Sequence, residues 1–280
     1  MNGAERAARV AALRAAGRYS EAVDAAAAAL ADDSAEAWRR GLGYEERRRL
    51  PAGDPAAEWR AFDALRRRRP TEAAAHALAG LSAHAAGRWD EGRAAFARAG
   101  RLGPAHALWA RAWGAKLRCW QAESFLGAGR TEAGLAAFAD AVRASGGASW
   151  ARAWAAQAEL WCGRPERAEK ALKAALKGAG DWSLGPRSWA VGWLALARLA
   201  SGDARAAERS FAEALKGDPG DAEALAGAAE AAWRLGRRSP ALALAKLLAE
   251  TCPGSPWSGV IETLAGRDPV GAWARLRAAD

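Results

Sequence analysis

The apolar positions of the chain fall in alanine-rich stretches of helical length, and turns that contain a glycine separate these stretches at regular intervals. Alanine is the best helix former and β-branched residues are few, so we expect helices rather than strands. Successive turn glycines stand 34 to 42 residues apart. This period is typical of stacked helical hairpins rather than of a globule with one central core. The turn glycines are Gly17, Gly53, Gly87, Gly129, Gly163, Gly202 and Gly236.

The third of these units, around Gly87, shows the hairpin most clearly. Its pattern predicts a first helix over about residues 72–86 and a second helix that ends near residue 100. Gly87 lies between the two helices and can adopt the positive φ that ends a helix. Asp90 and Glu91 come at the start of the second helix, where negative charge suits the helix dipole.

Small and large residues recur at fixed distances from the turn glycine. A small residue stands five positions after it in every unit except the second, which has Glu58. A large residue stands nine positions after it in the five inner units. Small residues allow two helices to cross closely, and a large one fills the gap between hairpins. The small residues are Ala22, Gly92, Gly134, Ala168, Ala207 and Ala241, and the large ones are Phe62, Phe96, Phe138, Leu172 and Phe211.

At these residues the chain resembles the tetratricopeptide repeat family, and the resemblance extends over about residues 4–253. It implies an all-α fold, a right-handed α-solenoid of about seven helical hairpins over residues 1–253. Residues 254–280 are expected to form a C-terminal capping helix pair, so the whole chain 1–280 is one solenoid. In this family the first helices of the hairpins line an inner concave groove.

Three units depart from the pattern. The second has an extended turn over residues 50–55 and carries Arg47, Arg48 and Arg49 where apolar residues are expected. The fourth has eight extra residues, which we interpret as a first helix lengthened backward to about residue 105. The sixth has five extra residues near residues 180–186, which we expect to form a loop.

Tryptophan is unusually frequent, with 15 residues in the chain. Trp120, Trp154 and Trp193 each stand nine residues before a turn glycine, in three successive units. The resemblance therefore implies an aromatic ladder on or near the groove. Aromatic residues at helical spacing are also commonly core residues, so packing remains an equal alternative. The residues predicted to contact a ligand are Trp120, Trp150, Trp154, Trp161, Trp189, Trp193, Lys116, Glu123 and Gln157.

The net charge is +9, and although arginines are spread over the chain, one concentration of them stands out. Residues 39–69 hold ten arginines against five acids. Some of these arginines lie at the end of a predicted helix, where basic residues suit the helix dipole. It also forms a candidate basic patch for an acidic protein or, as a less favoured alternative, nucleic acid. This patch consists of Arg47, Arg48, Arg49, Arg66, Arg67, Arg68 and Arg69.

The sequence offers no pattern for catalysis, and we expect neither a cofactor nor a metal. Known nucleophile, phosphate-binding and zinc motifs do not occur. Cys119, Cys162 and Cys252 are widely spaced and odd in number, which favours buried thiols over disulfides or a zinc site. Without a long apolar stretch or a secretory signal, we expect a cytoplasmic protein that does not enter the membrane.

These patterns predict a non-enzymatic scaffold for protein–protein interaction. An apolar groove with polar edges would suit an amphipathic helix or an extended peptide, and the basic second unit would suit an acidic partner. One alternative is a regulatory or substrate-presenting subunit of an enzyme complex. Another is self-association through the aromatic face.

Overall fold

The computed structural model describes residues 1–31, 53–102, 107–253, 255 and 257. The side chains of residues 30–31 and 107–113 also lie outside the description. Within the described residues all regular secondary structure is helical, which confirms the predicted all-α fold. The first helix predicted for the second unit, with Arg47–Arg49, lies outside the described residues. The same holds for most of the predicted cap.

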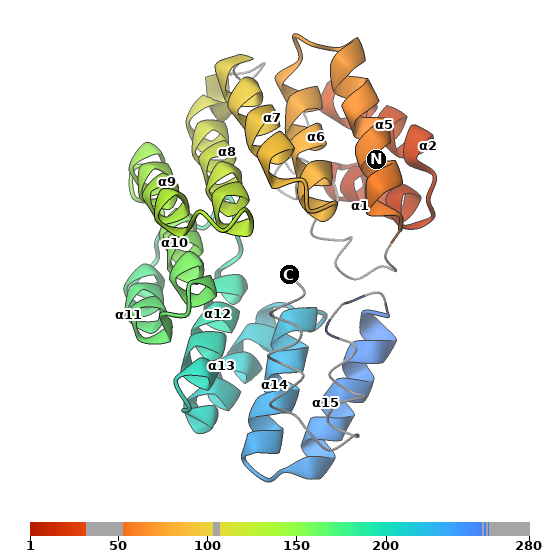
Figure 1. The fold of residues 1–280 in the computed structure, drawn as a ribbon. Helices are drawn as coiled ribbons and strands as arrows, with labels where there is room; N and C mark the ends of the chain where they lie inside the picture. The colour runs from red at the N-terminus through yellow and green to blue at the C-terminus, as the bar shows by residue number, and fades with distance from the viewer. Residues whose placement is uncertain (32–52, 103–106, 254, 256, 258–280) are drawn as a thin grey trace.

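Most helices pair as hairpins along the chain, in the order that the turn glycines predict (Figure 1). Among the described helices α8 is the longest, because the extra residues of the fourth unit extend its first helix backward, as expected. The helices are α1 (Gly3–Ala15), α2 (Tyr19–Ala31), α5 (Pro55–Arg68), α6 (Ala73–Ala85), α7 (Trp89–Leu102), α8 (Ala107–Gly127), α9 (Thr131–Ala144), α10 (Ser149–Trp161), α11 (Pro165–Leu176), α12 (Arg187–Ala200), α13 (Ala204–Gly217), α14 (Ala222–Arg234) and α15 (Arg238–Thr251).

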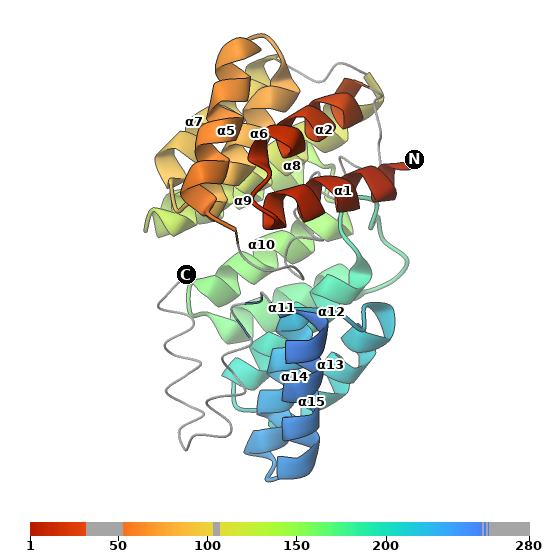
Figure 2. The ribbon, with the colours of Figure 1, turned by 90° about the vertical axis from the view of Figure 1, so that its right-hand side faces the viewer.

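The helices form a curved array, in which each helix from α5 to α15 packs against the next one along the chain (Figures 1 and 2). The first helices of units four to seven, α8, α10, α12 and α14, also contact one another in succession. In Figure 1, α9 and α11 lie on the outside of the curve, whereas α10 and α12 lie towards its inside. The helices α12 and α14 are consequently buried over most of their surface. In α11, by contrast, only a row of residues along one face is buried, namely Ala168, Leu172 and Ala175.

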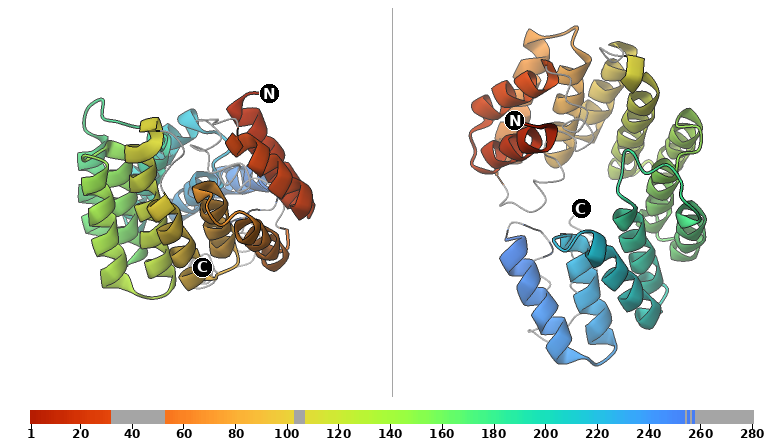
Figure 3. Two further views of the ribbon diagram at one scale, coloured as in Figure 1. Left: turned by 90° about the horizontal axis from the view of Figure 1, so that it is seen from above. Right: turned by 180° about the vertical axis from the view of Figure 1, so that it is seen from behind.

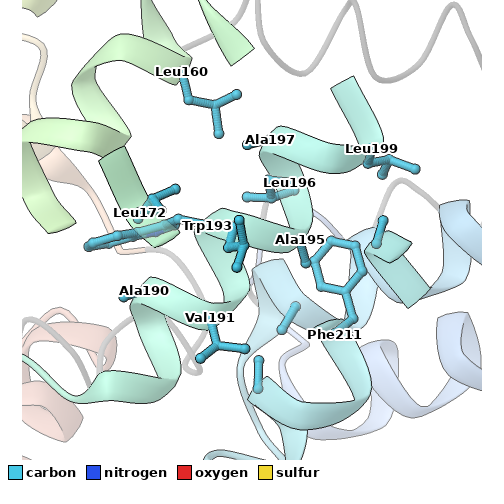
Figure 4. Packing of buried hydrophobic residues seen from close by; sticks show 14 of the residues in the cluster. Leu160, Leu172, Ala190, Val191, Trp193, Ala195, Leu196, Ala197, Leu199 and Phe211 are labelled. Carbon is cyan, nitrogen blue, oxygen red and sulfur yellow. The ribbon is translucent and has the colours of Figure 1, made fainter. Parts of the chain in front are cut away.

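The core is divided among clusters that bridge successive hairpins. The cluster in Figure 4 joins α10 to α14, with Trp193 of α12 close to Leu172 of α11 and Phe211 of α13 on the other side of α12. The positions predicted to be large are buried here, and small residues beside them allow the helices to approach. Stability therefore depends on contacts between neighbouring units, as in other repeat arrays.

All described turn glycines except Gly53 have positive φ, which an L side chain rarely adopts. At position 53 a glycine is required for another reason, because a side chain would not fit there. A Cβ at this position would lie 2.6 Å from the Tyr19 hydroxyl and 2.9 Å from the Arg14 carbonyl oxygen. The backbone N–H of Asp54 donates to the Tyr19 hydroxyl at 2.6 Å. The extended turn of the second unit is thus held against the first hairpin.

An arginine follows the turn glycine in several units and forms an ion pair with the preceding unit. Arg130 lies 3.4 Å from Asp90, and Arg164 lies 3.2 Å from Glu132. Arg237 lies 2.7 Å from the Glu208 carboxylate. Because these side chains are largely exposed, each pair by itself contributes little to stability. Their repetition links the second helix of one unit to the turn of the next.

Replacing Gly227 with alanine is expected to lower the free energy of unfolding by about 1 to 3 kcal/mol, because the added methyl group overpacks the core. A Cβ at Gly227 would lie 2.2 Å from Cζ of Phe211, which is fully buried. Gly192 is the matched control, since its nearest neighbour, Cβ of Ala214, would be 3.9 Å away. Gly192→Ala should stabilise the protein by up to about 1 kcal/mol through helix propensity. Denaturant unfolding followed by circular dichroism measures the free energy of unfolding of both variants. Equal changes in the two variants would contradict the prediction.

Candidate functional site

The predicted aromatic ladder is mostly buried. Trp120, Trp150 and Trp193 belong to the core, whereas Trp154 and Trp189 are partly exposed. Among the six predicted tryptophans, Trp161 at the end of α10 is the most open, with half of its surface exposed. Of the polar residues predicted beside the ladder, Lys116 and Gln157 are buried and Glu123 is partly exposed.

Two of the buried rings fill space between units. Trp120 of α8 stacks on Phe96 of α7, with 5.4 Å between ring centroids and 27° between ring planes. Trp193 lies in the cluster that includes Leu172 and Phe211. Tryptophan buries a large apolar area, which alanine-rich helices cannot supply themselves. These two indoles therefore hold adjacent hairpins together, and a role for them in binding stays a prediction.

Lys116, Trp120 and Trp154 come together between α8 and α10. The ammonium nitrogen of Lys116 lies 5.5 Å from the ring centre of Trp120 and 5.9 Å from that of Trp154. A cation at this distance from an indole is attracted to the electron-rich ring face. The indole N–H of Trp154 donates to the Glu123 carboxylate at 2.8 Å. Three predicted site residues on α8 thus meet one on α10.

The same group extends to α6 through His84, which sequence reasoning did not include. The ring nitrogen Nδ1 of His84 lies 3.9 Å from the Glu123 carboxylate, and Nε2 shares a hydrogen bond with the Ser124 hydroxyl at 2.6 Å. Burial lowers the pKa of His84 to about 4, so the imidazole is neutral near pH 7. We call the group His84, Lys116, Trp120, Glu123, Ser124 and Trp154 the inner-helix network.

One feature of the sequence could have indicated a role for His84. It stands three residues before its turn glycine, where the next three units have Leu126, Leu160 and Leu199. A histidine at a position where these units have leucine suggests a polar partner in the core, because a buried imidazole requires hydrogen bonds. The partners lie on α8, 39 and 40 residues further along the chain, and the sequence period does not identify them.

Burial controls the chemistry of the thiols on α8 and at the end of α10. Burial raises the pKa of the Cys119 thiol well above its ordinary value, and it also raises the pKa of Cys162. Both thiols are therefore protonated and weakly nucleophilic near pH 7. In the described part of the chain, no three histidine, cysteine, aspartate or glutamate residues are grouped so that they could hold a metal ion.

The segment over residues 177–186, between α11 and α12, lies against α8 and α10. Figures 2 and 3 show it as a wide excursion between the two helices that it connects. Leu184 is buried among residues of both α8 and α10. The backbone N–H of Trp150 donates to the Asp181 carbonyl oxygen at 3.1 Å. The loop predicted near residues 180–186 is therefore present, but its packing onto the predicted site was not foreseen.

The basic patch is only partly within the described residues, because Arg47, Arg48 and Arg49 lie outside them. At the end of α5, two arginines share one carboxylate, since Arg66 and Arg67 lie 2.6 Å and 2.7 Å from Asp63. Arg69 pairs with Glu72 at 3.2 Å, and Arg68 is exposed. Neighbouring acids thus offset part of this charge, and an acidic partner for the patch stays a prediction.

Within the described ranges, none of the helices combines the length and the apolar character that crossing a bilayer requires. This agrees with the charged and polar residues spread along every amphipathic helix.

The family model of the tetratricopeptide repeat matches residues 125–184 and 198–259. No curated protein matches the chain in sequence. Among solved structures, yeast Tom70 is similar, with 15% identity and a TM-score of 0.59 over 91% of this chain and 53% of that chain. The APC/C hetero-tetramer Cut9–Hcn1 is similar with 14% identity and a TM-score of 0.57, over 88% of this chain and 46% of that chain.

The chain thus spans about half the length of these two proteins. A tetratricopeptide repeat protein from Parabacteroides merdae is similar over more of its own length, with 16% identity, a TM-score of 0.50, and 87% of this chain and 88% of that chain covered. At these identities the likeness establishes the fold alone. The chain carries tetratricopeptide repeats over residues 125–184 and 198–259, and its helices as a whole take the fold of a tetratricopeptide repeat protein.

Proposed function

We propose that the chain is a non-enzymatic scaffold that binds a segment of another protein on the inner side of its curve, at α8 and α10. An array of hairpins presents a long continuous surface, and this suits an extended or helical partner. The similar structure of Cut9 is that of an assembly with a second protein, Hcn1. This likeness supports a binding role without naming the partner.

The observation that carries the proposal is the inner-helix network. Packing of hydrophobic residues alone would hold α8 and α10 together, yet this contact contains a lysine, a glutamate and two indoles. Glu123 and Trp154 are both partly exposed, so a partner can reach a carboxylate and an aromatic ring side by side. Such a pair can accept a hydrogen bond from a partner backbone and cover an apolar side chain.

Replacing Trp154 with alanine should therefore weaken partner binding by about 30-fold or more, which is the usual loss for a tryptophan at the centre of an interface. The experiment compares the proteins captured by wild type and by Trp154→Ala, with folding checked by circular dichroism. Binding of the captured partner is then measured by calorimetry with purified proteins.

Trp233→Ala is the matched control. Trp233 is also partly buried at a first helix, but it lies in α14, two units away from α10. This variant should keep the partner that Trp154→Ala loses. Equal partner binding by folded Trp154→Ala and wild type would remove the proposal.

A further inference from the structure

The chain supplies its own occupant for part of the proposed docking surface. The segment over residues 177–186 leaves the second helix of the fifth unit and reaches back to α8, which belongs to the fourth. Its contact with Lys116 joins residues 68 positions apart in the sequence. A connection between adjacent helices does not need this detour, since other units connect with a few residues.

Two apolar side chains, Leu184 and the partly buried Trp182, and two polar contacts hold the segment. Leu184 is 5% exposed and packs in a cluster with Ala115, Cys119 and Trp150. The ammonium group of Lys116 donates to the Leu184 carbonyl oxygen at 3.5 Å. The Asp181 carbonyl oxygen accepts from the Trp150 backbone. A foreign extended peptide would be recognised in the same way, by a side-chain pocket and by main-chain hydrogen bonds.

The first half of the segment is held less closely. Residues 177–181 are exposed, and Gly178 has a φ of 82°. Within residues 177–186 the structure records one internal hydrogen bond to a side chain, from the Ser183 N–H to the Asp181 carboxylate at 2.9 Å. An exposed stretch without secondary structure opens more readily than the helices that flank it.

We propose that the 177–186 segment is an internal ligand of the α8–α10 surface, and that an extended partner segment with a leucine anchor displaces it. The inference rests on the proposed function and specifies its ligand. The partner segment must present a leucine to the cavity that Leu184 now fills. It must also present a backbone carbonyl oxygen to Lys116, because a buried ammonium group is costly when it loses an acceptor.

The covalent connection makes the internal segment a strong competitor. A tethered ligand acts at an effective concentration in the millimolar range, so a free peptide must overcome that concentration. The intact chain should consequently bind a peptide of the same sequence weakly. Loosening the anchor should raise the apparent affinity for that peptide.

The test uses the full chain and a fluorescein-labelled peptide with the sequence of residues 179–187. Leu184→Ala should bind this peptide about tenfold or more tightly than wild type does, because the internal competitor has lost its anchor. Leu242→Ala, the same change at an exposed leucine on α15, should behave like wild type. A control peptide with alanine in place of its leucine should bind neither wild type nor Leu184→Ala. Fluorescence anisotropy measures all affinities, and equal binding by folded Leu184→Ala and wild type would overturn the inference.

A measurement on the wild type keeps the proposal testable should Leu184→Ala fail to fold. The Trp150 amide, which bonds to Asp181, should exchange its hydrogen faster than amides in the middle of α12, because the segment opens without global unfolding. Exchange as slow as that of α12 would show that the segment does not open, and would reject displacement. The two proposals remain separable, because partner loss in Trp154→Ala without peptide binding here would remove only this inference.

Discussion

Glu58→Ala should lower the free energy of unfolding by about 3 to 5 kcal/mol, because it leaves a buried charge without its partner. Arg14 is 2% exposed and Glu58 is fully buried. The Arg14 side chain donates to the Glu58 carboxylate through Nε at 2.9 Å and also through Nη2. The guanidinium of Arg14 lies 5.7 Å from the ring centre of Phe62 as well. Denaturant unfolding followed by circular dichroism measures the loss.

The repeat pattern supplies a rescue for this variant. Glu58 stands where the other units have alanine or glycine, and Arg14 stands where three later units have leucine. The double variant Arg14→Leu with Glu58→Ala restores both repeat residues and removes both charges. It should recover much of the lost stability, since replacing a whole buried ion pair with apolar residues is often neutral.

An exposed ion pair provides the control for Glu58. Glu21 pairs with Arg18 on the surface, where both side chains are more than half exposed. Glu21→Gln should leave the free energy of unfolding nearly unchanged, because solvent screens an exposed ion pair. If Glu58→Ala were as mild as this control, the buried pair would not contribute to the contact between the first two units.

His84 should make the protein less stable in acid. Its pKa is about 4 in the folded chain and 6.5 when unperturbed, so between these values the unfolded chain binds a proton that the folded chain does not. The contribution of neutral His84 is complete above pH 6.5 and is lost as the pH falls towards 4. The loss amounts to about 3 kcal/mol over this window.

Burial opposes protonation here although a carboxylate is near. His84 faces Trp89 and Phe96 of α7, with ring centroids 5.2 Å and 5.0 Å away. On α8 it faces Ser124 and Glu123, and Glu123 by itself would favour the charged imidazole. The aromatic surroundings prevail because they exclude the water that an imidazolium ion requires.

The variant His84→Leu isolates this effect. Leucine occupies the equivalent place in the next unit, where Leu126 packs against Gly134 as His84 packs against Gly92. The free energy of unfolding of wild type relative to His84→Leu should fall by about 3 kcal/mol between pH 7.5 and pH 4. A difference that stays constant or rises in acid would mean that Glu123 stabilises the protonated form.

Much of the fold was predictable because it is encoded locally. The turn glycines, the alternating small and large positions and the extra residues of the fourth unit predicted the hairpins and the long helix α8, and the structure confirms these elements. Each of these signals concerns residues within one or two helical turns, where backbone geometry and side-chain size act directly. Gly53 was an exception, since its role depends on Tyr19 in another unit.

The candidate site was predictable only in part. The equivalent spacing of Trp120, Trp154 and Trp193 placed them on successive first helices, as the structure has them. Whether such a ring faces a partner or a neighbouring helix depends on how closely the hairpins approach, and spacing along one helix does not report this distance. Trp120 and Trp193 became core residues because Phe96 and Leu172 of adjacent helices cover them.

By itself the sequence determined the hairpin period, the helical class and the positions that must be small or large, because these follow from the geometry of single helices and turns. Tertiary structure decided which buried charges meet, as Arg14 and Glu58 do, and where residues 177–186 lie. These outcomes depend on contacts between residues that are 44 to 68 positions apart. Such contacts form only when the hairpins stack on one another, and no local pattern specifies that approach.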